Sequence, residues 1–286
     1  MPAQLLQRRV DAHKGDFGHI FILAGSGRFS GAAVLCAEAA LRSGAGLVTL
    51  GIPQGLHQAI IKLKPKEAMT LPLPQTKEET LSLQGYKKIR DFASNIDILV
   101  IGPGLSQQKS TQSLIRKVIS GINKPRVIDA DGLNALSGHL KLLRAAPGGA
   151  GRPAILTPHP GEMARLLGVK VDKLQSGREK LALKFARDYK VILVLKGHRT
   201  VVADDKGNLY INKTGNPGMA AAGSGDVLTG MIAAFLGQGL NAFNAAKYAV
   251  YLHGLAGDLA AKEKTQISLI ASDIIDKIPE AIKKRS

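Results

Sequence analysis

Tryptophan is absent from this sequence, and aromatic side chains in general are scarce. Phe, Trp and Tyr make up 4% of the 286 residues. Proteins that hold nucleic-acid strands usually stack the bases on aromatic rings. We therefore predict no nucleic-acid partner, although the formal net charge is +17. The Lys and Arg residues are scattered rather than gathered in one block, and we interpret them as a basic surface that also attracts phosphorylated metabolites.

Cysteine and long apolar runs are also missing. Cys36 is the single cysteine, so no disulfide can form within the chain, as is typical of proteins kept in a reducing compartment. No stretch approaches the roughly 18 uninterrupted apolar residues of a membrane span, and residues 1–16 lack the apolar segment of a secretory signal. We expect a cytoplasmic protein with no membrane partner, in which Cys36 is a small buried hydrophobe rather than a nucleophile.

Short apolar runs recur along the chain and predict an α/β fold. Most are continuous rather than alternating, as in strands covered on both faces, and helical patterns at 31–46 and 171–190 lie between them. This alternation favours a central, mostly parallel sheet flanked by helices on both faces. The expected strands are 19–24, 46–52, 97–102, 126–130, 154–157 and 191–196.

The remaining segments complete one expected domain, residues 1–286. Runs at 200–204 and 208–212 flank a turn and predict a hairpin. After residue 225 the pattern becomes helical, at 226–239, 241–261 and 271–284. Residues 63–80 and 145–154 read as loops, and neither is long or polar enough to mark a domain boundary.

Glycine follows two of the expected strands. Gly25, Gly27 and Gly31 have the spacing G-x-G-x-x-x-G, which is not the dinucleotide fingerprint, and the next strand carries no acidic residue at its end. A Walker A motif is also absent. Such loops serve either as tight turns or as places where a ligand approaches the backbone. Gly102 and Gly104 end another strand in the same way.

Two carboxylates, Asp129 and Asp131, follow the strand at 126–130. Either can cap the next helix, or help to hold a metal ion, through water. Glu162 either favours the first turn of its helix electrostatically or joins that metal site. Lys196 ends a strand of the buried type, a position that favours contact with a nucleotide over a plain surface charge.

A histidine stands between two prolines in the stretch LTPHPGE. Proline restricts its own backbone and that of the preceding residue, so His159 should be held rigidly at a strand-to-helix corner. No second His or Cys lies at zinc-ligand spacing. We therefore expect His159 to contact a ligand rather than a zinc ion.

The stretch NPGMAAAGSGDVLTG combines small residues with a single acid. Gly223, Ser224 and Gly225 precede a helical pattern, so their backbone N–H groups should converge on an anion at the positive end of the helix dipole. Asp226 would then stand where it can take a proton from a substrate hydroxyl. The alternative role for Asp226 is a helix N-cap, which does not explain why so many neighbours lack side chains.

Eight motifs resemble one known family, in its order and spacing, across nearly the whole chain. They are HKGDFGHIFILAGS, SGAA with ALRSGAGLVT, IGPGL, DADGLNAL, ILTPHPGE, LKGHRTVV, NPGMA with GSGDVLTG, and AVYLHGLAGD. The sequence is similar to the ADP/ATP-dependent NAD(P)H-hydrate dehydratases, a nucleotide-repair branch of the ribokinase-like fold. The resemblance implies that the S epimer of hydrated NADH or NADPH (NADHX or NADPHX) is phosphorylated on its added hydroxyl and then loses phosphate.

The resemblance also implies site residues, and it places an anion hole at Gly223, Ser224 and Gly225. Asp226 is the implied catalytic base. Magnesium is expected with ADP or ATP, and the family often forms tetramers. The implied substrate contacts are Ala32, Gly104, His159 and Asp226, and the implied nucleotide contacts are Lys196, Gly197, His198, Arg199, Thr200 and Gly225.

Two departures from the family pattern stand out. The family commonly has G-G-T-G-D where this chain has Ala222 to Asp226, and we expect the anion site to survive because Ser224 keeps the hydroxyl. Many relatives also carry an amino-terminal epimerase domain, for which this chain lacks the length. We therefore expect the epimerase to be either a separate partner protein or the other half of a longer protein from which this chain is taken.

Two rival functions use some of the same features. A ribokinase-like kinase for another small alcohol would need the same glycine-rich loop and Asp226, but the dehydratase is favoured by HKGDFGH, TPHPGE and KGHRT as further parts of the site. A non-enzymatic nucleotide- or nucleic-acid-binding protein would explain the charge of +17. The ADP or ATP preference and the NADHX or NADPHX preference are not decided by the sequence.

Overall fold

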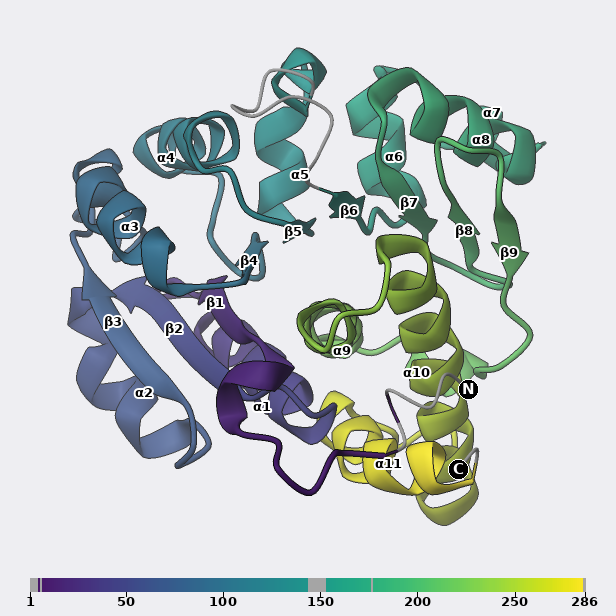
Figure 1. Ribbon diagram of the computed structural model, residues 1–286. Helices are drawn as coiled ribbons and strands as arrows, with labels where there is room; N and C mark the ends of the chain where they lie inside the picture. Colours follow the sequence, from purple (N-terminus) through teal and green to yellow (C-terminus); the bar gives the residue numbers. More distant parts are fainter. Residues whose placement is uncertain (1–4, 6, 144–152, 176, 285–286) are drawn as a thin grey trace.

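A nine-stranded sheet forms the centre of the molecule (Figure 1). The computed structural model describes residues 5, 7–143, 153–175 and 177–284. The strand order is β3-β2-β1-β4-β5-β6-β7-β8-β9. Pairings from β3 to β7 are parallel, and β8 and β9 continue antiparallel. The strands are β1 (His19–Leu23), β2 (Leu47–Pro53), β3 (Met69–Leu73), β4 (Ile98–Ile101), β5 (Arg126–Ile128), β6 (Ala154–Leu156), β7 (Ile192–Leu195), β8 (Val201–Ala203) and β9 (Leu209–Ile211).

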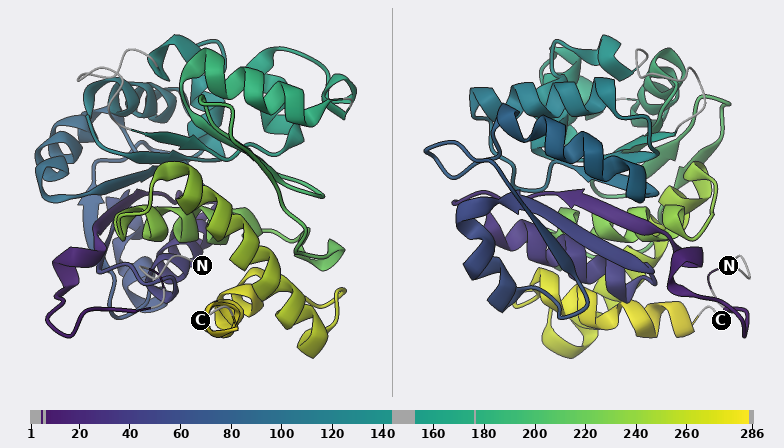
Figure 2. Two further views of the ribbon diagram at one scale, coloured as in Figure 1. Left: turned by 45° about the vertical axis from the view of Figure 1, so that its right-hand side comes forward. Right: turned by 60° about the vertical axis from the view of Figure 1, so that its left-hand side comes forward.

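Helices cover both faces of this sheet, as the sequence predicts (Figures 1 and 2). Helices α1, α9, α10 and α11 share one apolar core, and α3, α4, α5, α6 and α8 share the other. No helix in the described ranges combines the length and apolar character needed to cross a bilayer. The helices are α1 (Ser30–Arg42), α2 (His57–Leu63), α3 (Tyr86–Phe92), α4 (Lys109–Gly121), α5 (Asp131–Leu136), α6 (Pro160–Leu167), α7 (Asp172–Gln175), α8 (Arg178–Tyr189), α9 (Ser224–Gly237), α10 (Ala242–Lys264) and α11 (Ala271–Lys283).

The two cores divide the side chains of each central strand. In β1, Ile20 and Ile22 enter the core beneath α1 and α9, whereas Phe21 and Leu23 enter the core beneath α3 and α4. Alternate residues of a strand point to opposite faces, so a strand buried on both sides must be apolar throughout. This is why the continuous runs in the sequence locate β1, β4 and β7 correctly.

Cys36 lies in the core between α1 and α9 and is fully buried. A Cβ on Gly230 of α9 would collide with the Cys36 carbonyl oxygen, so the two helices approach closely at this point. Burial raises the pKa of the Cys36 thiol well above its usual range, and the charges of Asp226 and Asp129 raise it further. The predicted role as a small buried hydrophobe is confirmed.

Two predictions about local structure are wrong. The segment 63–80, expected to be a loop, contains β3, which lies at the edge of the sheet and includes Pro72; an edge strand tolerates a proline because it needs ladder bonds on one side only. The single helix expected at 171–190 is two helices, α7 and α8, separated around Gly177, which has a φ of 90°. The loop expected at 145–154 falls mostly on residues 145–152, outside the described residues.

Candidate functional site

Helix α9 begins at the carboxyl-terminal edge of the parallel strands, next to the ends of β4 and β5. Gly223 is its N-cap residue, with a φ of 87° that favours glycine. A Cβ at Gly223 would lie 2.5 Å from Cδ1 of Leu35 on α1, so a side chain has no room here. The N–H groups of Gly225 and Asp226 have no backbone acceptor within the described chain, so they are available to an anion at the turn where the sequence predicts an anion hole.

Asp226 is the third residue of α9 and does not cap the helix, because no side chain caps it. The carboxylate is half-buried. Burial raises its pKa, and repulsion from Asp129 and Glu162 adds to the effect, while Lys196 opposes it; the resulting pKa is about 7. A carboxylate with such a pKa is a far better proton acceptor than an ordinary aspartate near neutral pH.

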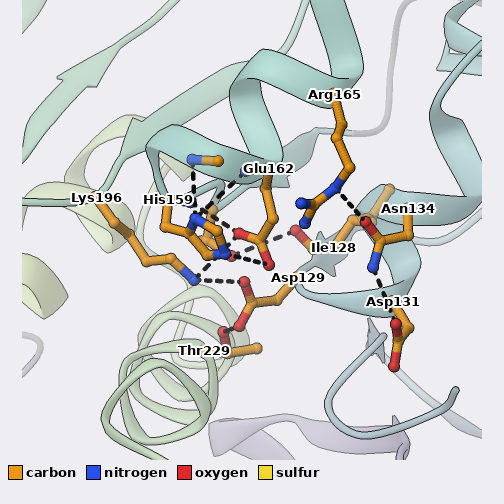
Figure 3. Close-up of polar contacts among 11 residues, drawn as sticks. Ile128, Asp129, Asp131, Asn134, His159, Glu162, Arg165, Lys196 and Thr229 are labelled. Carbon is orange, nitrogen blue, oxygen red and sulfur yellow. Dashed lines mark hydrogen bonds and ion pairs between the residues drawn. The ribbon is translucent and has the colours of Figure 1, made fainter. Parts of the chain in front are cut away.

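Asp129 and Lys196 form a buried ion pair in front of this helix (Figure 3). Lys196 Nζ donates to Asp129 Oδ1 at 2.7 Å, and Thr229 Oγ1, one turn along α9 from Asp226, donates to Asp129 Oδ2 at 2.9 Å. The Asp129 side chain is 2% exposed and that of Lys196 18%. The pair therefore ties the ends of β5 and β7 to α9.

The Lys196 ammonium group is also aimed at the anion-binding turn. A Cβ built on Gly225 would lie 3.3 Å from Lys196 Nζ. Burial alone would lower the pKa of Lys196, but Asp129 and Glu162 outweigh burial and raise it. The ammonium is thus held charged beside the backbone N–H groups of α9, where both would attract a phosphate.

His159 and Glu162 cap α6 reciprocally (Figure 3). The Glu162 carboxylate accepts from the His159 backbone N–H at 2.8 Å, and His159 Nδ1 accepts from Gly161 N–H at 3.0 Å. Because Nδ1 accepts, the neutral ring carries its proton on Nε2. Burial, Lys196 and Arg165 lower the pKa of His159, so the ring is a neutral donor at the edge of the site.

Glu162 joins this cap to the central ion pair. Besides the cap bond, its carboxylate lies 3.4 Å from His159 Nε2 and 3.8 Å from Lys196 Nζ. Burial raises the pKa of Glu162, while Lys196 opposes that shift. The side chain therefore serves the first turn of α6, as the sequence suggests, and reaches the site as well.

Asp131 lies apart from this cluster, and neither it nor Asp129 caps a helix. Helix α5 has Ala130 as its N-cap residue and no side-chain cap. Asp131 accepts from Ser106 N–H at 2.7 Å and from Asn134 Nδ2 at 3.0 Å. Ala130 itself has φ 47° and ψ −116°, a conformation that costs a non-glycine residue energy. The helix-cap role predicted for these aspartates is wrong.

Ala32 and Gly104 meet at the same carboxyl-terminal edge of the sheet, where the segments that follow β1 and β4 touch. A Cβ on Gly104 would lie 3.0 Å from the Ala32 Cβ and 2.8 Å from the Phe29 Cβ. Ser26 Oγ donates to the Gly104 carbonyl at 2.7 Å, and Gly25 N–H donates to the Pro103 carbonyl at 2.8 Å. The structure thus brings together two of the predicted substrate residues.

Residues 197–200 leave β7 as a turn at the same edge. Gly197 has a φ of 130° and Arg199 a φ of 55°, while Thr200 Oγ1 donates to the Gly197 carbonyl at 3.0 Å. His198 and Arg199 are exposed. Arg178 at the start of α8 binds the segment by donating to the carbonyls of Leu195 (3.1 Å), Lys196 (3.0 Å) and His198 (2.7 Å).

Three further residues support the site and were not singled out from the sequence. Arg178 carries no motif signal, because its role depends on partners far away in the chain; Thr229 lies in GSGDVLTG, but nothing in that motif points to its partner Asp129. His253 did have a signal, since it lies in AVYLHGLAGD. Its Nε2 is 3.4 Å from Ser224 Oγ, and burial lowers the pKa of His253 to about 4, so it faces the anion-binding turn as a neutral ring.

The HKGDFGH segment lies at the opposite end of the sheet, so its expected place in the site is wrong. It forms a 3-10 turn (Lys14–Phe17) before β1. A Cβ on Gly18 would lie 2.7 Å from the Cα of Gly237, the last residue of α9. Fourteen residues of helix, roughly 21 Å, separate that contact from the start of α9. A surface depression lined by Gly15, Gly18 and Lys124 also lies at this far end, and no predicted site residue lines it.

Comparison with known proteins agrees with this arrangement. A family model described as NAD(P)H-hydrate dehydratase matches residues 20–280. A bifunctional NAD(P)H-hydrate repair enzyme from Moorella thermoacetica is 45% identical over 281 residues, which are 98% of this chain and 52% of that protein. The chain spans about half the length of the first curated relatives it matches. An ADP-dependent (S)-NAD(P)H-hydrate dehydratase from Bacillus subtilis is 35% identical, over 99% of this chain and 95% of that protein.

Solved structures show the same fold. The ADP/ATP-dependent NAD(P)H-hydrate dehydratase from Bacillus subtilis, co-crystallized with ATP/Mg2+, has a TM-score of 0.82 and 34% identity over 98% of this chain and 94% of that one. A ribokinase-like superfamily protein from Enterococcus faecalis has a TM-score of 0.82 and 28% identity over 98% and 92% of the two chains. The fold is therefore ribokinase-like, as the sequence resemblance implies.

Proposed function

Because this chain belongs to the NAD(P)H-hydrate dehydratase family, we propose that it returns the S epimer of NADHX or NADPHX to NADH or NADPH with ADP or ATP as co-substrate. The observation that carries this proposal is the junction of three features at one helix start. These are an acid with a pKa of about 7, free backbone N–H groups, and a buried ammonium directed at them.

Asp226 is the catalytic base in this proposal. It accepts the proton of the hydroxyl that water addition has left on the nicotinamide ring, and the oxygen then attacks the terminal phosphorus of ADP or ATP. The bond from that phosphorus to the bridging oxygen breaks, which releases AMP or ADP. Negative charge on the transferring group would lie against the N–H groups of Gly225 and Asp226, where the Gly223–Ser224–Gly225 turn enters α9; they need no reorganisation because the helix already holds them in place. The Ser224 N–H itself donates to the Ala221 carbonyl at 3.3 Å.

The second stage restores the reduced ring. The phosphorylated carbon loses phosphate, and the adjacent ring carbon loses a proton, so that a carbon–carbon double bond forms in place of the C–O and C–H bonds. Phosphate is a much better leaving group than hydroxide, which is why the nucleotide is consumed. The site supplies an anion-binding turn for the departing phosphate.

The donor nucleotide is proposed to lie along the end of β7. Lys196, Gly197, His198, Arg199, Thr200 and Gly225 are its contacts in this proposal. Support comes from the position of Lys196 Nζ beside Gly225 and from the rigid support that Arg178 gives the segment. A nucleotide here would place its terminal phosphate at the start of α9.

The hydrated dinucleotide is proposed to occupy the other side of Asp226, against Ala32, Gly104 and His159. Contact between Ala32 and Gly104 supports this assignment, as does the neutral His159 ring, whose Nε2–H is a donor. Asp226 would then lie beside the substrate hydroxyl, whose oxygen must approach the terminal phosphorus opposite the bridging oxygen for an in-line transfer.

Magnesium is proposed to enter with the nucleotide rather than to reside in the protein. Within the described residues, no group of three His, Cys, Asp or Glu side chains is placed to hold a metal ion. Asp129 and Glu162 are bound to Lys196, and Asp131 to Ser106 and Asn134. Phosphate oxygens and water, the usual partners of Mg2+ in nucleotide sites, would therefore provide most of its ligands.

The assembly and setting also remain proposals. We expect residues 1–286 to form one domain of a cytoplasmic homotetramer, working with an epimerase that converts the R hydrate to the S hydrate. The Moorella thermoacetica relative is called bifunctional and is about twice as long as this chain, which supports such a pairing. Size-exclusion chromatography with light scattering would test the tetramer.

The decisive experiment follows the reduced-nicotinamide absorbance band of prepared NADHX and NADPHX with enzyme and magnesium. ADP and ATP are added in separate reactions, and pure R epimer without epimerase is the control. Recovery of the band with the S epimer is the expected result, and it identifies the donor at the same time. If no band returns with either nucleotide, while the protein is folded, the proposal fails. Asp226 would then be better explained as the base of a kinase for another alcohol.

A further inference from the structure

Phe29 is the one exposed aromatic side chain in a chain that has few rings. The seven phenylalanines and five tyrosines all lie within the described residues. Eleven of them are buried or half-buried, whereas Phe29 is 49% exposed. A single exposed apolar side chain is common on protein surfaces, so exposure alone assigns nothing. The neighbours of Phe29 have to decide its role.

These neighbours place the ring at the rim of the candidate site. Phe29 directly precedes α1, in the loop that leaves the carboxyl end of β1. A Cβ on Gly104 would lie 2.8 Å from the Phe29 Cβ and 2.8 Å from the Phe29 carbonyl oxygen. The Phe29 N–H donates to the Ser26 carbonyl at 2.9 Å, and Ser26 Oγ binds the Gly104 carbonyl. The loop that presents the ring is thus bound to the loop after β4.

The ring lies on the acceptor side of Asp226, away from the donor nucleotide. Strand β1 is four positions from β7 in the sheet. Neighbouring strands are about 4.8 Å apart, so roughly 19 Å separate their ends. Helix α9 packs against β1, β4 and β5, between the two. Phe29 is therefore far from residues 197–200 at the end of β7, where the proposed contacts of the donor nucleotide lie.

We propose, on the basis of the function proposed above, that Phe29 is the stacking platform for the adenine ring of the hydrated dinucleotide. Water addition has converted two carbons of the nicotinamide ring to tetrahedral centres, so that ring no longer offers a flat π-face. Adenine remains flat and is the natural partner for a phenyl ring. Arg28, whose guanidinium carbon is 5.7 Å from the Phe29 ring centroid, adds positive charge where the adenosine phosphates would lie.

The kinetic test compares Phe29→Ala with Phe29→Trp. Stacking of one base contributes about 1–3 kcal/mol, so the alanine variant should raise KM for the hydrate roughly 5- to 150-fold. The Trp variant should keep the KM near that of the parent. KM for ADP or ATP should stay constant in both, because that nucleotide does not touch position 29. Ile61→Ala, a truncation of a 44% exposed side chain on α2, is the matched control and should change neither KM.

A truncated substrate tests the identity of the stacked ring. The hydrate of reduced nicotinamide mononucleotide lacks adenosine, so Phe29→Ala and the parent should turn it over with the same KM. A KM increase that persists with this substrate would show that Phe29 contacts some other part of the molecule, and it would overturn the assignment to adenine.

A binding test separates this inference from the proposed reaction. Because the chain has no tryptophan, Phe29→Trp would carry its only indole. NADPH, the proposed product, should quench that emission saturably even with ADP already bound, and more strongly than reduced nicotinamide mononucleotide at saturation. Both ligands carry the dihydronicotinamide that accepts energy from indole, but only NADPH brings adenine to position 29. Ile61→Trp is the control and should show no difference between the two ligands. If the parent is active but the two ligands quench equally and KM does not change, the inference is overturned and the function stands; if NADPH quenches more strongly but the parent is inactive, the inference stands and the function is overturned.

Discussion

Buried polar groups are fully paired at one end of the parallel sheet and incompletely paired at the other. At the amino end, Arg126 is 3% exposed and binds three carbonyl oxygens, those of Ile119, Ile122 and Lys124. His19, at the start of β1, also uses both ring nitrogens, with Asn95 and Thr49 at 2.8 Å each. Every side-chain nitrogen of these two residues has a partner within the fold, so neither residue is arranged to bind a ligand.

At the carboxyl end, charges of the same sign are held close together and donors are left free. Asp226 stands near Asp129 and Glu162, and only Lys196 offsets their repulsion. The first turn of α9 keeps two N–H groups without backbone acceptors. The contrast teaches that burial alone does not mark a functional residue. Incomplete pairing does, because a ligand can then supply what the fold leaves out.

The largest effect should come from Asp226→Asn, which removes the proposed base while keeping the shape of the side chain. Turnover should fall at least ~10²-fold, the low end for loss of a general base, with little change in nucleotide affinity. Steady-state rates and a nucleotide titration measure the two effects. Unchanged turnover would remove Asp226 from the mechanism.

The same variant should be more stable than the parent at pH 8. Because the folded-state pKa of Asp226 is raised from 3.8 to about 7, its ionisation destabilises the fold as pH rises through that range. The shift corresponds to at most about 4 kcal/mol, and the advantage of the Asn variant should vanish towards pH 4. Urea unfolding at both pH values provides the measurement, and equal stability at pH 8 would contradict the assigned pKa.

At the amino end, Arg126→Met should damage the fold and spare the chemistry. The change leaves three buried carbonyl oxygens without donors, and each such loss costs about 1–3 kcal/mol. We expect a drop of roughly 3 kcal/mol or more in the free energy of unfolding, with kcat per folded molecule unchanged. Loss of turnover in protein that is still folded would break the distinction between the two ends. Arg116→Met, on the half-buried side of α4, is a control at which little change is expected.

Asp129→Asn sharpens the comparison at the carboxyl end. The substitution removes the negative charge of Asp129, which raises the pKa of Asp226. It leaves Lys196 in place, whose positive charge lowers that pKa. The acidic limb of the kcat profile, expected near pH 7 in the parent, should therefore move to lower pH. A merely structural role for Asp129 would reduce the rate at every pH without moving the limb, so the full pH profile must be recorded. A shift to higher pH would contradict the electrostatic account.

The smallest effect is expected from Ala130→Gly. The backbone at Ala130 has φ 47° and ψ −116°, which costs a residue with a Cβ about 1–3 kcal/mol; glycine avoids this cost but loses more entropy on folding. A net gain of about 1 kcal/mol in the free energy of unfolding should result. Ala135→Gly, inside α5, should instead destabilise by about 1 kcal/mol. Destabilisation of both variants alike would show that Ala130 is not strained.

Much of the fold could be predicted because buried parallel strands have a distinct composition. The ILVI of β4 and the ILVL of β7 are apolar on both faces, and no exposed segment would keep such runs. Strand β3 escaped prediction because it is only partly buried, lies at an edge and contains Pro72. The break between α7 and α8 escaped because a glycine inside an amphipathic pattern is compatible with a continuous helix as well.

The candidate site was predictable where the backbone itself forms it. Gly223 and Gly225 mark the start of α9, where Gly223 has a φ of 87° and a Cβ on Gly225 would lie 3.3 Å from Lys196 Nζ, and that signal is local. Pairs such as Asp129 with Thr229 join positions 100 residues apart, and a single sequence contains no record of them. HKGDFGH shows the reverse error, since Gly18 packs closely against α9 and the Lys14 backbone packs against Gly46 before β2, far from the chemistry.

The buried position of Cys36 has a practical consequence for labelling the protein. Its thiol is enclosed between α1 and α9 and kept protonated, so maleimide reagents, which attack exposed thiolates, should leave the native molecule unmodified. Any cysteine placed on the surface, for instance at exposed Lys206 between β8 and β9, would then be the sole attachment point for a dye or spin label. The wild-type chain is in this respect already a thiol-free background, with no core substitution required.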